Sequence, residues 1–185
     1  MIRIFDIIIS ILTLLTLSPI IFLISFYILL INGRPIIFKQ IRVGLNGKEF
    51  IIFKFRTMNN FNHQDEIVRL TNFGKLLRKA SLDELPQLFN VLKKDMSIVG
   101  PRPLPKNIEN KIKLNFRKKR RKILPGITGL SQVNYSGNKR KLNEKVKLDL
   151  EYIDNYSVYN YLKILIKTPL VLIIRLFKNK SSIIK

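Results

Sequence analysis

The chain lacks cysteine and tryptophan and has a single histidine. Without cysteine it forms neither disulfide bonds nor thiolate metal sites. The one histidine, His63, lies in a polar run at 59–65 and has no partner for a zinc site, so we expect it in an exposed loop. For the same reason we do not expect catalysis by a serine–histidine–aspartate triad. Any metal should be a hard cation held by oxygen atoms, of which magnesium is the first choice.

Acidic residues are also scarce. The 185 residues include 12 Asp and Glu against 34 Lys and Arg, which gives a formal net charge of +22 and a pI near 10.5. A charge of this sign and size indicates a polyanionic partner, which is a nucleic acid, an anionic membrane surface or a phosphorylated substrate. The length allows one domain.

Two adjacent carboxylates, Asp83 and Glu84, are conspicuous in this basic background. Arg78 precedes them and Pro86 follows. Because proline fits a helix only in its first turn, Pro86 predicts a helix that starts close to Asp83. The free backbone N–H groups of such a start favour anions, including phosphate. The alternative is a capping box, in which Ser81 is the N-cap residue and Glu84 follows three residues later.

A long apolar segment occupies the N-terminal part of the chain. The 25 residues from Ile7 to Ile31 carry no charge, and a helix that crosses a bilayer core needs roughly 20. Ser18-Pro19 lies near the middle, where proline removes a helical hydrogen bond and bends the axis. By itself this pattern favours a kinked spanning helix over re-entry to the same face. The basic residues after the segment favour a cytoplasmic location for the rest of the chain.

The remaining patterns predict an α+β fold that is mostly helical. Residues 36–57 alternate around Asn46-Gly47 and predict a β-hairpin, and residues 58–70 read as a polar loop. Hydrophobic periodicity predicts helices at 73–79, from Asp83 to about 93, at 106–122 and at 142–155. The tail at 161–177 has an apolar stripe and predicts an interfacial amphipathic helix, broken or restarted at Thr168-Pro169. A core-facing helix is the alternative for this tail.

Three further segments carry candidate functional groups. In Gly100-Pro101-Arg102-Pro103-Leu104, two prolines stiffen the backbone around an arginine, the side chain best suited to forked recognition of phosphate. A solvated arginine on a rigid turn is the alternative. Residues 117–122 are consecutive cations, typical of a solvated face or an anionic-lipid patch. The glycine-rich loop at 124–130 allows either close approach to a ligand or a tight turn.

Taken together, these elements resemble the bacterial sugar transferase family, the small monotopic phosphoglycosyl transferases that load sugars onto polyprenyl carriers. The resemblance covers nearly the whole chain. Its motifs, in order, are Ser18-Pro19, Phe53-Lys54-Phe55-Arg56-Thr57-Met58, Ser81-Leu82-Asp83-Glu84-Leu85-Pro86-Gln87-Leu88-Phe89-Asn90-Val91-Leu92, Asp95-Met96-Ser97-Ile98-Val99-Gly100-Pro101-Arg102-Pro103-Leu104 and Pro125-Gly126-Ile127-Thr128-Gly129-Leu130-Ser131-Gln132-Val133-Asn134.

The resemblance implies one membrane-associated α+β domain, residues 1–185, on the cytoplasmic face of the bacterial inner membrane. Residues 1–32 would form a re-entrant helix broken at Ser18-Pro19, residues 33–160 the catalytic part and residues 161–185 the interfacial tail. The implied reaction moves a sugar-1-phosphate from a UDP-sugar to polyprenyl (undecaprenyl) phosphate, releases UMP and begins the assembly of a surface glycan. Mg²⁺ is the implied cofactor, and no nucleic-acid partner is expected.

The same resemblance implies roles for individual residues. Asp83 is the expected nucleophile and would form a phosphosugar-aspartyl intermediate. Glu84 would either hold magnesium together with Asp83 or manage the proton of the lipid phosphate. The candidates for phosphate binding are Arg78, Arg102, Lys54 and Arg56.

The chain departs from the family pattern at Val43, Lys94 and Leu124, and at 135–138, where the departure bears on donor choice. None of these changes removes the acid pair. Two other functions are consistent with the composition. One is a non-catalytic scaffold of a glycan assembly complex at the membrane surface, and the other is a membrane-tethered nucleic-acid binder that uses residues 117–122. Both predict that Asp83 is dispensable.

Overall fold

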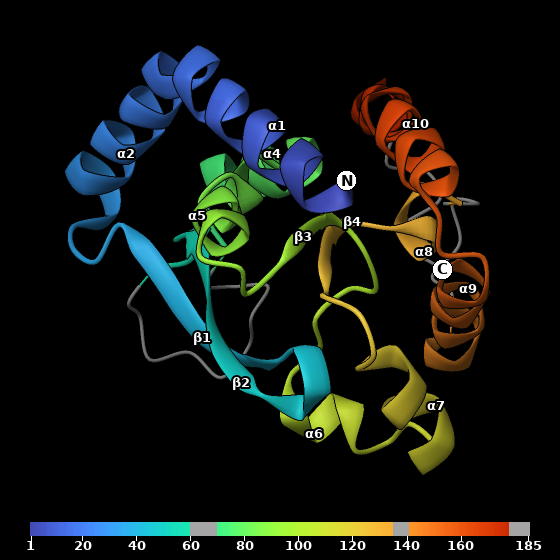
Figure 1. Cartoon of the computed structure of the whole chain (residues 1–185). Helices are drawn as coiled ribbons and strands as arrows, with labels where there is room; N and C mark the ends of the chain where they lie inside the picture. The colour runs from blue at the N-terminus through green and yellow to red at the C-terminus, as the bar shows by residue number, and fades with distance from the viewer. Residues whose placement is uncertain (60–69, 135–140, 178–185) are drawn as a thin grey trace.

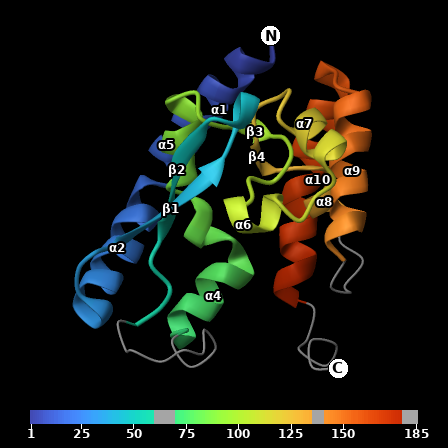
Figure 2. The ribbon, with the colours of Figure 1, turned by 90° about the horizontal axis from the view of Figure 1, so that it is seen from below.

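The computed structural model describes residues 1–59, 70–134 and 141–177. These residues form a mostly helical structure with two small sheets, which confirms the α+β class (Figure 1). Helices α1 and α2 lie along one flank and α9 and α10 along the other, with the short strands and helices between them (Figure 2). Three predictions fall wholly or mostly outside the described residues, namely the polar loop at 58–70, the exposure of His63 and the effect of the departure at 135–138.

The apolar N-terminal segment forms two helices, α1 (Ile2–Thr16) and α2 (Ser18–Asn32), which meet at Leu17 with a bend of 63°. Pro19 lies in the first turn of α2, where its missing N–H removes no helical hydrogen bond. The Ser18 hydroxyl donates to the carbonyl of Leu15 at 2.8 Å. The predicted break at Ser18-Pro19 is therefore confirmed as a bend between two helices. Among the described helices none passes as a membrane span alone, whereas α1 and α2 do so as a bent pair.

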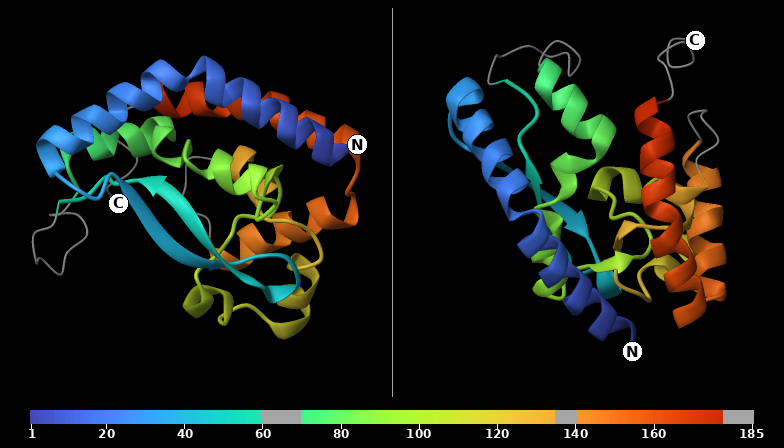
Figure 3. Two further views of the ribbon diagram at one scale, coloured as in Figure 1. Left: turned by 60° about the vertical axis from the view of Figure 1, so that its left-hand side comes forward. Right: turned by 90° about the horizontal axis from the view of Figure 1, so that it is seen from above.

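The same two helices are also part of the protein core. Ile24 and Ile28 of α2 are buried against Phe55 and Leu77. Other apolar side chains remain exposed, and Figure 3 shows α1, α2 and α10 along the side of the molecule opposite α6 and α7. We call the exposed apolar residues of these three helices the apolar layer: Ile4, Ile7, Ile8, Ile11, Leu12, Leu15, Ile20, Phe22, Leu23, Phe26, Tyr27, Leu29, Leu30, Ile31, Tyr159, Ile166, Leu170, Ile173, Ile174 and Phe177.

The predicted β-hairpin is confirmed. Strands β1 (Ile37–Val43) and β2 (Glu49–Phe55) pair antiparallel, with Ile37 opposite Phe55 and Val43 opposite Glu49. The connection contains a 3₁₀ turn, η1 (Leu45–Gly47), in which Asn46 and Gly47 have φ values of 53° and 81°. Asparagine and glycine tolerate this left-handed backbone better than other residues, which is why the dipeptide was an effective turn signal.

A second, parallel pair of strands was not predicted. Strand β3 (Ser97–Val99) pairs with β4 (Gly126–Thr128). A Cβ atom on Gly126 would lie 2.0 Å from the backbone nitrogen of Gly100, so these two backbones pack too closely for a side chain. Within the described residues, this glycine of the 124–130 loop therefore serves contact between two chain segments.

The predicted helices at 73–79 and 142–155 are confirmed as α4 (Asn72–Ala80) and α9 (Leu142–Asp154). The helix predicted from Asp83 to about 93 is present as α5 (Gln87–Leu92), which begins later than predicted. The predicted single helix at 106–122 is wrong, because the chain forms α6 (Lys106–Glu109) and α7 (Leu114–Arg120) with a turn between them. Ile112 is buried in that turn and Lys113 has extended backbone, which ends one helix before the next begins. The short helix α8 (Leu130–Val133) follows β4.

The predicted break in the C-terminal tail is also wrong. Helix α10 (Val158–Phe177) continues through Pro169. The hydroxyl of Thr168 donates to the carbonyl of Ile164 at 2.8 Å, and Tyr161 and Ile164 are buried in the core. Packing along the helix thus outweighs the hydrogen bond that Pro169 removes. The core-facing alternative is confirmed for Tyr161 and Ile164, and the later turns carry exposed apolar side chains of the apolar layer.

Candidate active site

The acid pair lies in a single 3₁₀ turn, η2 (Leu82–Glu84), between α4 and α5. The predicted helix start near Asp83 is wrong, because α5 begins at Gln87 and Pro86 is its N-cap residue. The capping box is wrong as well. Ser81 has φ 56° and its side chain makes no cap hydrogen bond. Its left-handed backbone ends α4 and reverses the chain within one turn, which leaves Glu84 free to face the basic side chains of other elements.

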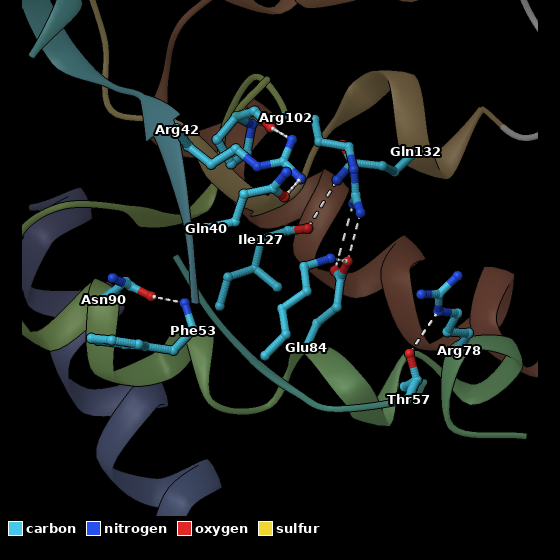
Figure 4. Close-up of polar contacts among 12 residues, drawn as sticks. Gln40, Arg42, Phe53, Thr57, Arg78, Glu84, Asn90, Arg102, Ile127 and Gln132 are labelled. Carbon is cyan, nitrogen blue, oxygen red and sulfur yellow. Dashed lines mark hydrogen bonds and ion pairs between the residues drawn. The ribbon is translucent and has the colours of Figure 1, made fainter. Parts of the chain in front are cut away.

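Glu84 is held between two cations. Its Oε1 accepts a hydrogen bond from Lys54 Nζ at 2.6 Å and from Arg102 Nη2 at 2.5 Å (Figure 4). The side chain is 12% exposed. Burial by itself would raise the pKa of Glu84, but the charges and hydrogen bonds of Arg102 and Lys54 outweigh it and lower the pKa to about 2. Glu84 is therefore a fixed anion that orients two cations.

Asp83 has the opposite environment. It is 7% exposed, and its carboxylate makes no hydrogen bond or ion pair with any of the residues described. Burial and the adjacent charge of Glu84 raise the pKa of Asp83 to about 6, against the lowering effect of Lys54, Arg78 and Arg102. Because this carboxylate is buried and unpaired, its lone pair is available to attack a phosphorus atom. The cations around it attract the negative charge of a phosphate.

A buried ion pair between Arg120 and Asp149 holds the backbone of Arg102 in place. Its backbone carbonyl accepts a hydrogen bond from Arg120 Nη2 at 2.8 Å. Arg120 in turn pairs with Asp149 at 3.0 Å, and the Ser131 hydroxyl donates to the same carboxylate at 2.8 Å. The side chains of Arg120 and Asp149 are 5% and 4% exposed. This support is what directs the stiff proline-flanked segment toward the acid pair.

Sequence analysis missed the Arg120–Asp149 pair. A signal was present, because Val146, Asp149 and Tyr152 recur at helical spacing and all three are buried. A carboxylate on the buried stripe of a helix requires a partner, and in such a basic chain that partner is a cation. The sequence did not identify which of the many cations it would be.

Lys54 is fixed by the contact between β2 and α5. The side chain of Asn90 accepts from the backbone N–H of Phe53 at 3.0 Å and donates to the carbonyl of Ile51 at 2.7 Å. Asn90 is fully buried. Its side-chain amide therefore bonds the backbone of β2 as a neighbouring strand would. These bonds fix the position from which Lys54 reaches Glu84.

The two other predicted phosphate-binding residues differ in location. Arg78 lies in the last turn of α4 and donates its Nε to the Thr57 hydroxyl at 3.0 Å. Its terminal nitrogens make no hydrogen bond within the described residues, and its charge lowers the pKa of Asp83. Arg56 is not brought to the acid pair. It is 7% exposed and donates to the backbone carbonyls of Asn32, Pro35 and Met58, which favours a structural role at the end of α2.

The consecutive cations at 117–122 are not a free basic patch. Lys119 pairs with Asp154, Arg120 with Asp149, and Arg121 with Glu109 at 3.1 Å. These contacts join α6, α7 and α9. They leave fewer free charges for a polyanion than the sequence suggested, which weakens the nucleic-acid alternative.

A magnesium ion is compatible with the site only as a partner shared with a substrate. The described residues contain no cluster of three or more His, Cys, Asp or Glu side chains. Asp83 is unpaired, and Oε2 of Glu84 has only a contact of 3.5 Å to Arg102. Two adjacent carboxylates that leave the remaining ligand positions to phosphate oxygens and water are a usual magnesium donor set. The residues present therefore fit the ion.

Comparison with known proteins is consistent with this geometry. A family model described as bacterial sugar transferase matches residues 1–175. The uncharacterized sugar transferase EpsL of Bacillus subtilis is 44% identical over 173 residues, which are 90% of this chain and 84% of that protein.

Two further relatives carry more specific names. The UDP-glucose:undecaprenyl-phosphate glucose-1-phosphate transferase of Klebsiella pneumoniae is 38% identical over an alignment of 193 positions, which covers 97% of this chain and 41% of that protein. The UDP-N-acetylgalactosamine-undecaprenyl-phosphate N-acetylgalactosaminephosphotransferase of Aeromonas hydrophila is 36% identical over 174 residues, 88% of this chain and 41% of that protein. The chain thus spans about two fifths of the length of these two relatives.

Proposed function

The chain belongs to the bacterial sugar transferase family, and on this premise we propose that it transfers a sugar-1-phosphate from a UDP-sugar to undecaprenyl phosphate and releases UMP. The names of the relatives from Klebsiella and Aeromonas support the donor and acceptor classes. The observation that carries the proposal is the Asp83 carboxylate, which is buried and unpaired beside Lys54, Arg78 and Arg102.

In the proposed first step, an oxygen of Asp83 attacks the phosphorus atom that carries the sugar. A bond forms between this oxygen and phosphorus, and the bond from phosphorus to the bridging oxygen breaks. The electron pair of the broken bond goes to UMP, which leaves. The product is a phosphosugar-aspartyl intermediate. In this step Lys54 and Arg102 would neutralise the charge of the transferring phosphoryl group, a role supported by the ion pairs through which Glu84 holds both side chains.

In the proposed second step, an oxygen of the polyprenyl phosphate attacks the same phosphorus atom. The bond between phosphorus and Asp83 breaks, which restores the carboxylate and yields the polyprenyl diphosphosugar. Arg78 is suited to the lipid phosphate because α4 packs against the membrane-facing helices. Phe73 of α4 contacts Tyr27 of α2 with ring centroids 4.0 Å apart. Two displacements at one fixed carboxylate avoid a direct encounter between two anionic substrates.

The environment of Glu84 favours an electrostatic role over proton transfer. A carboxylate whose pKa is lowered to about 2 is a weak base at neutral pH. Asp83 and the Oε2 side of Glu84 would hold a magnesium ion together with the donor's diphosphate, and the bound ion would supply further charge neutralisation.

The apolar layer supports attachment to the bacterial inner membrane from its cytoplasmic face. The bend of 63° between α1 and α2 suits a helix pair that enters the bilayer and returns to the same side. Such shallow insertion would let the acid pair meet a water-soluble donor and a lipid acceptor on one surface. The excess of cations adds attraction to anionic lipids of roughly 1 kcal/mol for each one near the surface.

The test is UMP release by the purified protein in lipid discs with magnesium, undecaprenyl phosphate and a panel of UDP-sugars. We expect one donor to give UMP and a lipid-linked sugar. Asp83→Asn should lower the rate by at least 10³-fold, because an amide lacks the anionic oxygen of the nucleophile. Asp154→Asn is the matched control, since its exposed carboxylate pairs with Lys119 away from the site.

Each outcome separates the candidate functions. Loss of UMP release in Asp83→Asn alone supports the covalent route. Equal rates in the wild type and Asp83→Asn would contradict it. Absence of UMP release from every donor, with normal membrane binding, would favour the non-catalytic scaffold instead.

A further inference from the structure

Arg42 and Gln87 have hydrogen-bond donors that play no part in the proposed steps. Both residues line a small pocket next to Glu84, together with Ile52, Lys54, Arg102 and Pro103. Two nitrogen atoms of the lining residues are buried and have no partner among the described residues, namely Nε of Arg42 and Nε2 of Gln87. Gln87 is 2% exposed. Buried donors are almost always paired in folded proteins, so two unpaired donors on side chains that line one pocket indicate a place for an acceptor.

The charge around this pocket also lacks a counterpart. The terminal nitrogens of Arg42 donate to neutral acceptors, to Gln40 Oε1 at 2.5 Å and to the carbonyl of Pro103 at 3.2 Å (Figure 4). The carboxylate whose charge acts on Arg42, that of Glu84, is already bonded to Lys54 and Arg102. Burial and the charge of Arg102 lower the pKa of Arg42. A cation held next to other cations without its own carboxylate is stabilised by a bound anion.

Arg42 and Arg78 lie on opposite sides of Glu84 (Figure 4). The charge of Arg42 is coupled to Arg102 and Glu84, and that of Asp83 to Glu84, Lys54, Arg78 and Arg102. Arg42 is near the end of β1, far along the hairpin from α2, and Arg78 is on α4 (Figure 3). The cations therefore extend from Arg78 on α4, past Glu84, to Arg42 on the hairpin.

We propose that Arg42 and Gln87 form the subsite for the phosphate of the departing UMP, and so hold the nucleotide end of the donor on the hairpin side of the acid pair. The inference rests on the proposed function. In an in-line displacement the leaving oxygen is opposite the attacking carboxylate. When its bond to phosphorus breaks, that oxygen keeps the electron pair and the UMP phosphate gains a negative charge. The N–H groups of Arg42 and Gln87 are free to donate to that phosphate, where the new charge appears.

The experiment measures the dissociation constant of UMP directly, by titration calorimetry on the protein in lipid discs. The variants are Arg42→Lys, which keeps the charge but lacks Nε–H, and Gln87→Leu, which keeps the size but lacks the donor. Each should weaken UMP binding by roughly tenfold or more, the loss expected for one hydrogen bond to a charged group. The KM for undecaprenyl phosphate should stay within about twofold, since that phosphate is proposed to bind at Arg78, on the other side of Glu84. Lys39→Gln, an exposed cation on the same strand, should leave UMP binding unchanged.

Several results would overturn the subsite. Unchanged UMP affinity in both variants would mean that the pocket holds only a buried water. A raised KM for undecaprenyl phosphate with unchanged UMP affinity would assign it to the acceptor. If one variant fails to fold, as judged by thermal unfolding, the other decides. Failure of the proposed function is distinguishable, because the wild type would then neither bind UMP nor release it from any donor.

Discussion

Two adjacent carboxylates acquire opposite properties in this site. Lys54 and Arg102 stabilise the charge of Glu84, while Asp83 is buried without a partner and next to another anion. Burial and the charge of Glu84 destabilise the charged form of Asp83 and so raise its pKa, and a destabilised carboxylate is a better nucleophile toward phosphorus. The division of roles between the two acids thus follows from which of them forms ion pairs with the cations.

This difference predicts the pH dependence of the first chemical step. Asp83 must be ionised to attack, so kcat/KM for the donor should rise with pH up to about 6 and be level above it. Below about 6 it should fall roughly tenfold for each pH unit, as protonated Asp83 accumulates. The measurement is kcat/KM from pH 5 to 8, with the lipid acceptor saturating.

The variant Arg78→Gln tests whether the ionisation of Asp83 causes this pH dependence. Arg78→Gln removes a charge that lowers the pKa of Asp83, so the inflection should move to higher pH. A profile that is flat between pH 5 and 8 in the wild type would show that the ionisation of Asp83 does not limit the reaction.

Lys94 shows how a departure from the family pattern is accommodated. By resemblance to the family, glycine is frequent at this position, and here Lys94 has φ 67°. The left-handed backbone costs a side-chain-bearing residue roughly 1–2 kcal/mol, which glycine avoids. The turn between α5 and β3 therefore requires this conformation whichever residue occupies it.

At the scale of elements, α1 is fastened to the catalytic part by polar groups. Asp6 is 1% exposed and accepts hydrogen bonds from Ser97 Oγ at 2.9 Å, Ile98 N at 2.8 Å and Tyr161 Oη at 2.8 Å. Arg3 donates to the carbonyls at the end of α5, including that of Val91 at 2.7 Å. These bonds join α1 to β3, α5 and α10. The apolar helix is therefore anchored on one face and exposed on the other.

This arrangement predicts strong coupling between Asp6 and Tyr161. Asp6→Asn should lower the free energy of unfolding by roughly 2 kcal/mol, since it replaces a charged acceptor of three hydrogen bonds. Tyr161→Phe should lower it by about 1 kcal/mol. The double variant should be more stable than the sum of the two losses implies, by about 1 kcal/mol, as expected for residues in contact. Denaturant unfolding in detergent gives all three values.

The exposed Asp154→Asn serves as the control and should change the free energy of unfolding by less than about 0.5 kcal/mol. Strict additivity of Asp6→Asn and Tyr161→Phe would contradict a direct bond between their side chains.

At the scale of the whole molecule, the protein has two functional surfaces, which are the apolar layer and the basic site. The layer is formed by α1, α2 and α10, and the hairpin, α6 and α7 lie on the opposite side (Figure 3). The acid pair is carried between them by η2. In the proposed reaction this order matches a lipid acceptor on one side and a soluble nucleotide sugar on the other.

The membrane topology can be tested because the chain contains no cysteine. A single cysteine is inserted after Met1 or substituted for Arg34, at the two ends of the bent helix pair. Re-entry predicts that both react with an impermeant thiol reagent from the cytoplasmic side in inverted membrane vesicles. Replacing Ser18-Pro19 by two alanines should straighten the pair and transfer one end to the other side. Labelling of the two positions from opposite sides in the parent chain would show a spanning helix.

The sequence by itself determined the features that depend on local chemistry. Asn46-Gly47 specifies the hairpin turn, and Ser18-Pro19 specifies the bend, because both act through the backbone of a few neighbouring residues. The scarcity of acids made Asp83 and Glu84 conspicuous, and the flanking prolines did the same for Arg102. The continuity of α10 through Pro169 was missed because packing of its buried residues, not local backbone preference, decides it.

Only the tertiary structure decided which polar groups meet. Asp6 and Tyr161 are 155 residues apart, and the sequence pattern around each residue does not identify the other as its partner. The same holds for the support of Arg102 by Arg120 and Asp149, and for the pocket of Arg42 and Gln87. A basic chain offers many cations to few acids, so pairing follows from packing geometry. That geometry lowers the pKa of Glu84, raises that of Asp83 and thereby distinguishes two carboxylates that are neighbours in the sequence.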